Sequence, residues 1–364
     1  MSGPPLSARA LGRATLARQL LLGRDDRSVP DAVAHLLGLN AQEPDLPYLA
    51  LWSRLERVTI TDVTRAIEDG TLVRSTLMRS TQHVMTAEDF TLVRPALAGL
   101  LRRVQRNTFG SRTRGIDLGE LVRDARELLA DGTVLTRPEL GRRLAASRPG
   151  ADPTALGWTV QYLLPVTHPA PSGTWRTRGA TPFALPRGAL PAEATADDVA
   201  TLLRRYLAAF GPATVSDMRV WSGISGLREV VAGMRPDLRV LRDERGRELL
   251  DLPEAPLPDP DTPAPVRLLP AFDAFLLGHH DRTRVMSDDV RRQVCVGSGV
   301  AATVLVDGTV AATWDLVVGD GAATLTVSPF RRLSAAERDE VEAEAHRLLA
   351  FTDPGAEHDV RVVG

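Results

Sequence analysis

The chain has 364 residues, 43% hydrophobic and 25% charged, which is typical of a globular protein large enough for two or three domains. All 44 basic residues are Arg and none is Lys, which excludes a P-loop lysine, a kinase lysine and a lysine Schiff base. A single cysteine, Cys295, excludes a disulfide framework, and no apolar run approaches the ~20 residues that span a bilayer, so we expect a cytoplasmic protein.

The net charge of −2 hides an uneven distribution along the chain. Residues 1–250 contain 34 Arg and 27 acidic residues, a balance of +7. Residues 251–364 contain 10 Arg and 19 acidic residues, a balance of −9. The mild excess of positive charge in the first two-thirds favours contact with a polyanion such as nucleic acid.

The first region is expected to be helical and then to form a β-hairpin. Helical periodicity covers four segments, residues 8–22, 30–39, 48–55 and 60–68. Strand-like runs follow at 72–78 and 82–85, with Arg79 and Ser80 at the bend. Thr86 is expected to cap a helix over residues 87–104. Helices followed by a hairpin predict a winged helix over residues 1–114.

Two further groups of helices follow, and each ends in a wing-like segment. The first group has helices at 118–129, from Thr136 and at 153–164, then a basic irregular wing at 168–186. The second group has helices at 197–210, from Thr214 and at 227–234, then a strand–turn–strand wing at 238–252. Glu139 and Asp217 are expected to complete capping boxes with these two threonines. The pattern predicts winged helices over 115–192 and 193–252.

The character of the chain changes after residue 252. Residues 253–265 read as a Pro-rich acidic linker. Residues 266–364 contain several strand patterns with Asp-Gly turns, and a helix that Ser334 and Glu337 are expected to cap. We expect a small β-barrel, or a curled sheet, with one packed helix, and an α+β fold class overall.

Two carboxamides, Asn40 and Gln42, lie one residue apart in the short break "GLNAQEP". Asn is common at helix ends and turns, so the simpler interpretation is that these residues only end the helix. A functional interpretation becomes favoured once the rest of the sequence is considered.

Five segments in order resemble one family. They are "RATLARQLLL", "LLGLNAQEPDLPYLALWSRL", "TLMRSTQHVMTAEDF", "LLPAFDAFLLGHHDRTRV" and "TVLVDGTVAATW", and they are similar to the winged-helix DNA glycosylases of the AlkZ/YcaQ superfamily. The resemblance covers nearly the whole chain. It implies three tandem winged helices in a C-shaped arrangement, a C-terminal β-barrel, a basic concave surface for duplex DNA, and excision of alkylated purines. Some members of the family excise bulky adducts of the producing bacterium's own antibiotic, which gives self-resistance.

The resemblance also implies a catalytic role for Asn40 and Gln42. They align with the family's Gln–apolar–Gln motif, so Gln42 matches and Asn40 departs from it. Asn carries the same donor and acceptor groups as Gln on a side chain one methylene shorter. This displaces its polar head by roughly 1.5 Å, and a misplacement of that order can cost ~10²-fold in rate.

Neutral amides suit the implied reaction. A purine alkylated at N7 is cationic and leaves readily, so the enzyme must mainly orient a water and stabilise an oxocarbenium-like sugar. We expect Gln42 to position the water and Asn40 to assist it or contact the sugar. Glu43 or Asp45 acting as a carboxylate base is an alternative, although Pro44 between them suggests that they cap the next turn.

Several basic and aromatic residues are candidates for DNA contact. On the first hairpin they are Arg79 and His83, for which a packed or wing-stacking role is the alternative to a phosphate contact. In "GTWRTRG" they are Trp175, Arg176 and Arg178, where Trp175 either wedges beside a groove or packs inside a loop. The stretch from Phe90 to Ile116 has no acidic residue and carries a possible phosphate-binding stripe, Arg94, Arg102, Arg103, Arg106, Arg112 and Arg114. By resemblance, Arg282 belongs to a recurring loop near the DNA.

No metal site or cofactor is expected. His279, His280 and Asp281 are consecutive and therefore point in different directions, unlike residues that share a metal. The sequence predicts a monomeric, monofunctional glycosylase that excises N7-alkylated purines from duplex DNA. The alternative is a non-catalytic winged-helix DNA-binding protein, and a metal-dependent hydrolase would need an acidic cluster that the sequence lacks.

Overall fold

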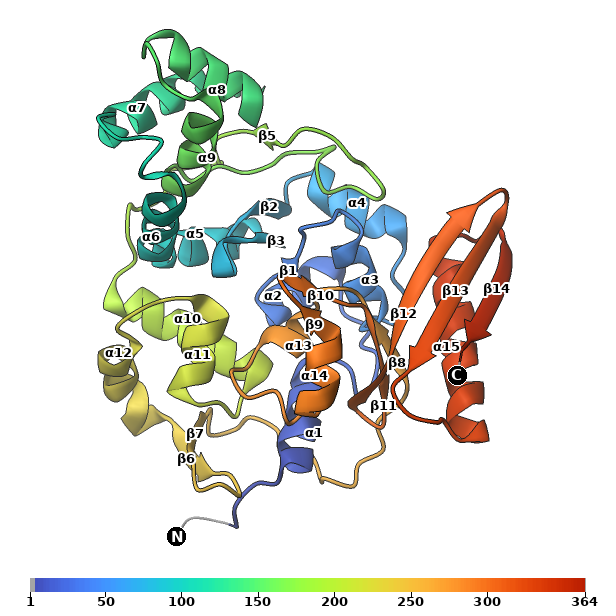
Figure 1. The fold of residues 1–364 in the computed structure, drawn as a ribbon. Coiled ribbons are helices and arrows are strands. Elements are labelled where there is room, and N and C mark those ends of the chain that lie inside the picture. Colours follow the sequence, from blue (N-terminus) through green and yellow to red (C-terminus); the bar gives the residue numbers. More distant parts are fainter. Residues whose placement is uncertain (1–3, 364) are drawn as a thin grey trace.

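The structure is a computed structural model that describes residues 4–363 (Figure 1). The first region has six helices, α1 (Ala8–Arg18), α2 (Val29–Leu36), α3 (Leu46–Trp52), α4 (Ile60–Glu68), α5 (Ala87–Ala96) and α6 (Ala98–Phe109). Its strands β1 (Leu39–Asn40), β2 (Leu72–Thr76) and β3 (Gln82–Thr86) form an antiparallel sheet in the order β1-β3-β2. Arg79 and Ser80 form the predicted bend, in the short helix η1 (Met78–Ser80), and both have positive φ.

The single helix predicted over residues 87–104 is wrong, because the chain forms two helices there. Pro95 lies in the last turn of α5, and the helix is interrupted at Leu97, whose φ of −90° and ψ of 0° depart from helical values, before α6 begins. A proline has no amide hydrogen, and its ring crowds the carbonyl group four residues earlier. The interruption redirects α6 toward the next group of helices, where it contacts α9 (Pro153–Leu163).

Two further groups of three helices follow, each with one antiparallel pair of strands, which ends the third group but in the second joins a strand before its second helix to one after its third. The second group contains α7 (Leu118–Leu128), α8 (Arg137–Ala146), α9, β4 (Leu135–Thr136) and β5 (Pro182–Phe183). The third contains α10 (Ala196–Phe210), α11 (Val215–Ser222), α12 (Leu227–Met234), η2 (Arg235–Asp237), β6 (Arg239–Arg242) and β7 (Glu248–Asp251). The capping boxes predicted at Thr136 and Thr214 are both present.

The three groups do not each have a hydrophobic core of their own. Side chains of the first group, such as Val33 and Leu37, share one core with Leu203 and Phe210 of α10. The second group has a separate core around Leu121, Leu140 and Val160, among others. Figure 1 shows the second group at one end of the molecule, with the first and third groups next to each other.

The C-terminal region is built on an open five-stranded sheet. Its strands are β8 (Arg267–Leu269), β11 (Thr303–Val306), β12 (Thr309–Gly319), β13 (Ala322–Pro329) and β14 (Glu357–Val362), in the order β14-β13-β12-β11-β8. The helix α15 (Ala335–Thr352) begins at the predicted cap, Ser334, and packs Val341, Ala345 and Leu348 against the sheet (Figure 1).

The prediction of a closed β-barrel is wrong, and the sheet with one packed helix is what the described residues form. Strand β14 pairs parallel to β13, whereas the other pairs in this sheet are antiparallel. A parallel pair requires a crossover connection, which α15 provides. The crossover places β14 on the outer edge of the sheet and leaves it unpaired with β8 at the opposite edge.

The remaining C-terminal elements are short. They are the helices α13 (Ala274–Leu277) and α14 (Asp288–Val294), and the strands β9 (Cys295–Val296) and β10 (Gly299–Val300), which form a hairpin of their own. Within residues 4–363 no helix is long and apolar enough to cross a membrane.

The predicted linker, residues 253–265, has no helix or strand, but arginines of α1 hold it in place. The guanidinium groups of Arg9, Arg13 and Arg18 donate to the carbonyl oxygens of Pro260, Thr262 and Pro256. The segment is therefore bound along its length to the first helix.

Buried ion pairs join segments that are far apart in the sequence. Arg18 and Asp251 form a bidentate pair, at 2.6 and 2.9 Å, in which both side chains are almost completely buried. Arg239 also donates to Asp251, at 2.8 Å. Arg54 pairs with Asp273 at 2.7 and 2.9 Å, again fully buried. These pairs attach α1 and α3 to the third group and to the C-terminal region.

Candidate active site

The two predicted amides lie together at the end of β1. The chain leaves α2 through Leu37 and Gly38, both with positive φ, and Asn40 pairs with His83 of β3. The Asn40 side chain is buried, and its Oδ1 accepts the backbone N–H of Gln42 at 3.1 Å. Its Nδ2 donates to Oε1 of Gln42 at 3.3 Å, while Gln42 itself is exposed. Asn40 thereby orients the exposed amide.

A pocket of about 370 Å³ opens beside Gln42. One side is formed by the motif and the first sheet, and the other by the loop between α9 and β5, which we call the α9–β5 loop (residues 164–181). The pocket is lined by Gln42, Glu43, Pro44, Arg74, Gln82, Pro171, Ser172, Gly173, Thr177, Arg178, Gly179, Ala180, Thr181 and Pro182. The candidate site therefore lies between the first and second groups of elements.

Two residues that the sequence analysis did not select hold the motif in place. The backbone N–H of Ala41 donates to the carbonyl oxygen of Gln82 at 2.8 Å. The guanidinium of Arg74 donates to the carbonyl oxygen of Ala41 from Nε, at 3.0 Å, and from Nη2, at 2.8 Å. Strand alternation offered a signal for Arg74, because it lies on the same face of β2 as the buried Leu72.

The model of the DNA glycosylase AlkZ-like family matches residues 33–351 of the chain, a range that contains the motif and its pocket. The chain belongs to this family. It is 28% identical over 361 residues to an interstrand DNA cross-link repair glycosylase of Streptomyces sahachiroi, covering 91% of this chain and 92% of that protein. The solved structure of the Streptomyces sahachiroi DNA glycosylase AlkZ is similar with a TM-score of 0.81 at 26% identity, covering 99% of this chain and 100% of that one.

The family membership confirms the predicted resemblance and identifies an enzyme, a DNA N-glycosylase. The alternative of a DNA-binding protein without catalytic activity is accordingly set aside. No group of three or more His, Cys, Asp or Glu in the described part of the chain is arranged to hold a metal ion.

The acidic neighbours of the motif in this AlkZ-like glycosylase are not arranged as predicted. Asp45 precedes α3, but its side chain makes no capping hydrogen bond, so the expected capping role is wrong. Its carboxylate instead accepts the backbone N–H of Arg176 at 2.6 Å and the guanidinium of Arg178 at 3.1 Å. Glu43 is exposed and lies 3.7 Å from the Arg178 guanidinium. Asp45 is therefore occupied in holding the α9–β5 loop, which argues against it as a base.

His83 and Arg79 do not project from the surface of the first hairpin. His83 is buried under Asn40, with Nδ1 3.1 Å from the carbonyl oxygen of Thr81. Burial lowers its pKa to about 3, and the nearby charge of Arg79 acts in the same direction. Burial also lowers the pKa of Arg79 to about 10, helped by the charge of Arg282. His83 is thus a neutral packing residue at neutral pH, which does not suit a phosphate contact.

Acidic pH should destabilise the AlkZ-like glycosylase through its buried histidines. Burial lowers the pKa of His83, His168 and His279 to about 3 each. In the unfolded chain these groups titrate near pH 6.5, so below that pH the unfolded state binds protons that the native state does not. The free energy of unfolding should fall between about pH 6.5 and pH 4, by up to roughly 1.4 kcal/mol per pH unit for each histidine. Urea denaturation at pH 7, 6 and 5 measures this slope.

A pair of variants provides the control. His168→Gln should make the slope shallower, because one of the three groups is removed, whereas a change at the exposed His346, His346→Gln, should leave it unchanged. A free energy of unfolding that is the same at pH 7 and pH 5 would contradict the assignment of neutral buried histidines.

The α9–β5 loop uses Trp175 and Arg176 for its own attachment. Trp175 is half-buried and packs on Tyr48 and Phe351, with ring centroids 5.2 and 6.2 Å apart. The backbone N–H of Trp175 donates to the hydroxyl of Tyr48 at 3.0 Å. Arg176 forms a bidentate pair with Asp353, both contacts at 2.8 Å. Of the two interpretations of Trp175, the structure shows the packed side chain, and both Arg176 and Arg178 of the loop are exposed.

The arginines of the predicted phosphate-binding stripe lie in different environments and most of them contact other parts of the protein. Arg94 is buried, donates to the carbonyl oxygen of Tyr162 at 2.8 Å, and has a pKa lowered to about 10 by burial. The exposed Arg102 pairs with Glu193, Arg103 donates to the carbonyl oxygen of Gly223, and Arg112 pairs with Asp152. Arg106 and Arg114 are exposed and have no ion pair with any described residue.

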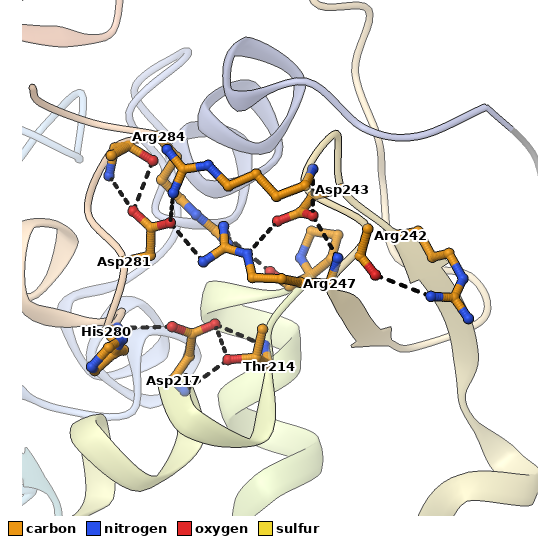
Figure 2. Close-up of polar contacts among 12 residues, drawn as sticks. Thr214, Asp217, Arg242, Asp243, Arg247, His280, Asp281 and Arg284 are labelled. Atoms are coloured by element: carbon orange, nitrogen blue, oxygen red, sulfur yellow. Dashed lines mark hydrogen bonds and ion pairs between the residues drawn. The ribbon is translucent and has the colours of Figure 1, made fainter.

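The "GHHDR" segment of the AlkZ-like glycosylase joins the C-terminal region to the third group (Figure 2). Asp217 accepts the backbone N–H of His280 at 2.8 Å. Asp281 pairs with Arg247 at 2.7 Å and with Arg245 at 3.1 Å. Burial raises the pKa of Asp281, but hydrogen bonds from Thr283 and Arg247 outweigh it and hold the pKa at about 2. Arg282 is half-buried and lies 3.1 Å from Sγ of Cys295.

Proposed function

We propose that the protein is a monofunctional glycosylase that hydrolyses the N-glycosidic bond of N7-alkylated purines, including bulky and cross-linked ones, in duplex DNA. The observation that carries this proposal is the contact between the two carboxamides at the mouth of the pocket. Asn40 Nδ2 occupies one acceptor position of Gln42 Oε1, at 3.3 Å, and so limits the orientations of the exposed amide. The preorganised amide then presents its remaining acceptor position and its amide hydrogens to the pocket side.

The chemistry requires little more than an oriented water. A purine alkylated at N7 carries a positive charge and departs as a neutral base, so no strong acid is needed. Gln42 accepts a hydrogen bond from the attacking water, and its carbonyl dipole faces the positive charge that develops on the sugar. The water attacks C1′ of the deoxyribose, the bond from C1′ to the base breaks with its electron pair going to the base, and the water loses a proton to solvent, so the products are the neutral free base and an abasic site.

The absence of lysine supports a purely hydrolytic reaction. Bifunctional glycosylases cut the strand through a Schiff base between an amine and the sugar. Because the sequence contains no Lys, its terminal amine is the only candidate for such a step, and the product should be an intact abasic site.

Two observations favour bulky lesions. The relative from Streptomyces sahachiroi is named for repair of interstrand DNA cross-links. The pocket beside Gln42 has about 370 Å³, more space than a methyl group requires and within the range of small-molecule sites. We propose that the pocket accommodates a bulky substituent, such as that of an antibiotic adduct. The enzyme would then contribute to self-resistance.

Duplex DNA would be held by the three groups of helices acting as tandem winged helices on one concave side, with one protein molecule per lesion. The exposed Arg106, which has no ion pair with any described residue, would be the first of the predicted contacts, and Arg102, Arg103, Arg178 and Arg282 would add to it. Trp175, Arg176, Arg79 and His83 would act indirectly, by holding the loop and the hairpin in place.

The deciding experiment compares release of free base from two duplexes, one carrying N7-methylguanine and one carrying a bulky N7-guanine adduct. We expect release from both, faster from the bulky adduct, with an abasic strand that breaks only after alkaline treatment. Binding to both duplexes without release of base from either would overturn the proposed function. Strand cleavage without alkali would overturn its monofunctional character.

A further inference from the structure

Arg74 is a buried arginine without a carboxylate partner. It lies in β2, has 7% of its surface exposed, and makes no ion pair within the described residues. Burial lowers its pKa to about 10, and the charge of Glu43 only partly opposes this. The guanidinium is therefore still charged at neutral pH. A charge that is buried without a counter-ion is costly, so its hydrogen bonds must satisfy it.

The donors of Arg74 divide between two parts of the site. Nε and Nη2 converge on the carbonyl oxygen of Ala41, the residue between the two amides, and Nη2 lies 3.5 Å from the carbonyl oxygen of Gln42. Nη1 donates to Oγ of Ser172 in the α9–β5 loop at 2.8 Å. One side chain thus binds both the motif and the opposite wall of the pocket.

The backbone around Arg74 reinforces this arrangement. Its carbonyl oxygen accepts the N–H of His168, a residue of the α9–β5 loop, at 2.8 Å. Gly173 packs against the aliphatic part of the side chain, with φ of +90°, and a Cβ there would come 2.8 Å from Cδ of Arg74. A side chain at residue 173 would therefore displace the arginine as well as strain the backbone.

We infer that Arg74 is a positioning residue of the reaction: it sets the orientation of Asn40 and Gln42 through the carbonyl group of Ala41, and ties them to the pocket wall. The inference rests on the proposed function of the two amides. Lysine cannot replace this contact fully, because an ammonium group offers one donor centre, whereas the planar guanidinium reaches two acceptors on opposite sides.

The test compares Arg74→Met and Arg74→Lys with a matched control, Arg94→Met. Arg94 is equally buried, also lacks a carboxylate partner and also has a pKa of about 10, but it donates to α9 rather than to the motif. We expect Arg74→Met to slow single-turnover base release by roughly 10²-fold, with little change in duplex affinity. Arg74→Lys should recover part of the rate, and added guanidinium ion should partly rescue Arg74→Met. Arg94→Met should lower the melting temperature to a similar extent without changing the rate of the folded fraction.

A second readout does not depend on activity. The side-chain amide signals of Asn40 and Gln42, observed by NMR with selectively ¹⁵N-labelled amides, should shift in Arg74→Met and stay in place in Arg94→Met. Unchanged signals, or a rate loss that only follows the loss of folded protein, would overturn the inference. If the wild type releases no base, the proposed function fails, and the amide signals still decide whether Arg74 positions the motif.

Discussion

Changing Gln42 to alanine is expected to slow single-turnover release of an N7-alkylated purine by about 10²-fold or more, because one preorganised polar group at a reacting centre contributes that much. The exposed position of Gln42 means that its removal leaves no cavity in the core. The melting temperature should therefore stay close to that of the wild type, and duplex affinity should change little. Quantifying the released base by chromatography against time gives the rate, and fluorescence anisotropy gives the affinity.

Two further variants sharpen this result. Gln293→Ala removes an exposed glutamine from α14, outside the pocket lining, and serves as the matched control with an unchanged rate. Asn40→Ala removes both the donor to Oε1 of Gln42 and the acceptor of its backbone N–H, so it should slow the reaction as well. If Gln42→Ala releases base at the wild-type rate, the two amides have only the structural role at the helix end that is the simpler interpretation of the sequence.

Changing Asp251 to alanine is expected to lower the free energy of unfolding by about 3–5 kcal/mol, because it leaves two arginines without their partner in the protein interior. Asp251 receives Arg18 at 2.6 and 2.9 Å and Arg239 at 2.8 Å, and its side chain is completely buried. Urea denaturation followed by circular dichroism measures the change.

The matched control for this prediction is Asp359→Ala. Asp359 also pairs with an arginine, Arg361 at 2.7 Å, but the two side chains are 42% and 64% exposed. An exposed pair contributes at most about 1 kcal/mol, so the control should change the free energy of unfolding only slightly. Equal decreases in the free energy of unfolding for the two variants would show that burial does not increase the contribution of the Asp251 ion pairs to stability.

Local features of this chain were predictable because they depend on neighbouring residues. The capping boxes at Thr136, Thr214 and Ser334 involve residues three positions apart, and all are present. The contact between Asn40 and Gln42 has the same local origin, since an Asn side chain readily accepts the N–H two residues later.

Features that depend on distant segments were not predictable. The basic residues selected for DNA contact looked free in the sequence, yet Arg176 is paired with Asp353, 177 residues away, and Arg178 with Asp45, 133 residues away. The barrel prediction was wrong for the same reason, because the strand patterns do not reveal that β14 joins the sheet in parallel. Arg74 was missed because the partner of its guanidinium, the carbonyl of Ala41, is a backbone group that no sequence pattern identifies.

The attachment of Arg176 to Asp353 has a consequence for the order in which the enzyme becomes complete during translation. The α9–β5 loop, one wall of the pocket, emerges from the ribosome long before α15, which precedes Asp353. Until that aspartate is made, the loop lacks one of its anchors and Phe351 is absent from the packing around Trp175. A nascent chain that already displays Asn40 and Gln42 therefore still has an unfinished pocket. We therefore expect the chain to release a base only after the C-terminal region has folded onto the rest.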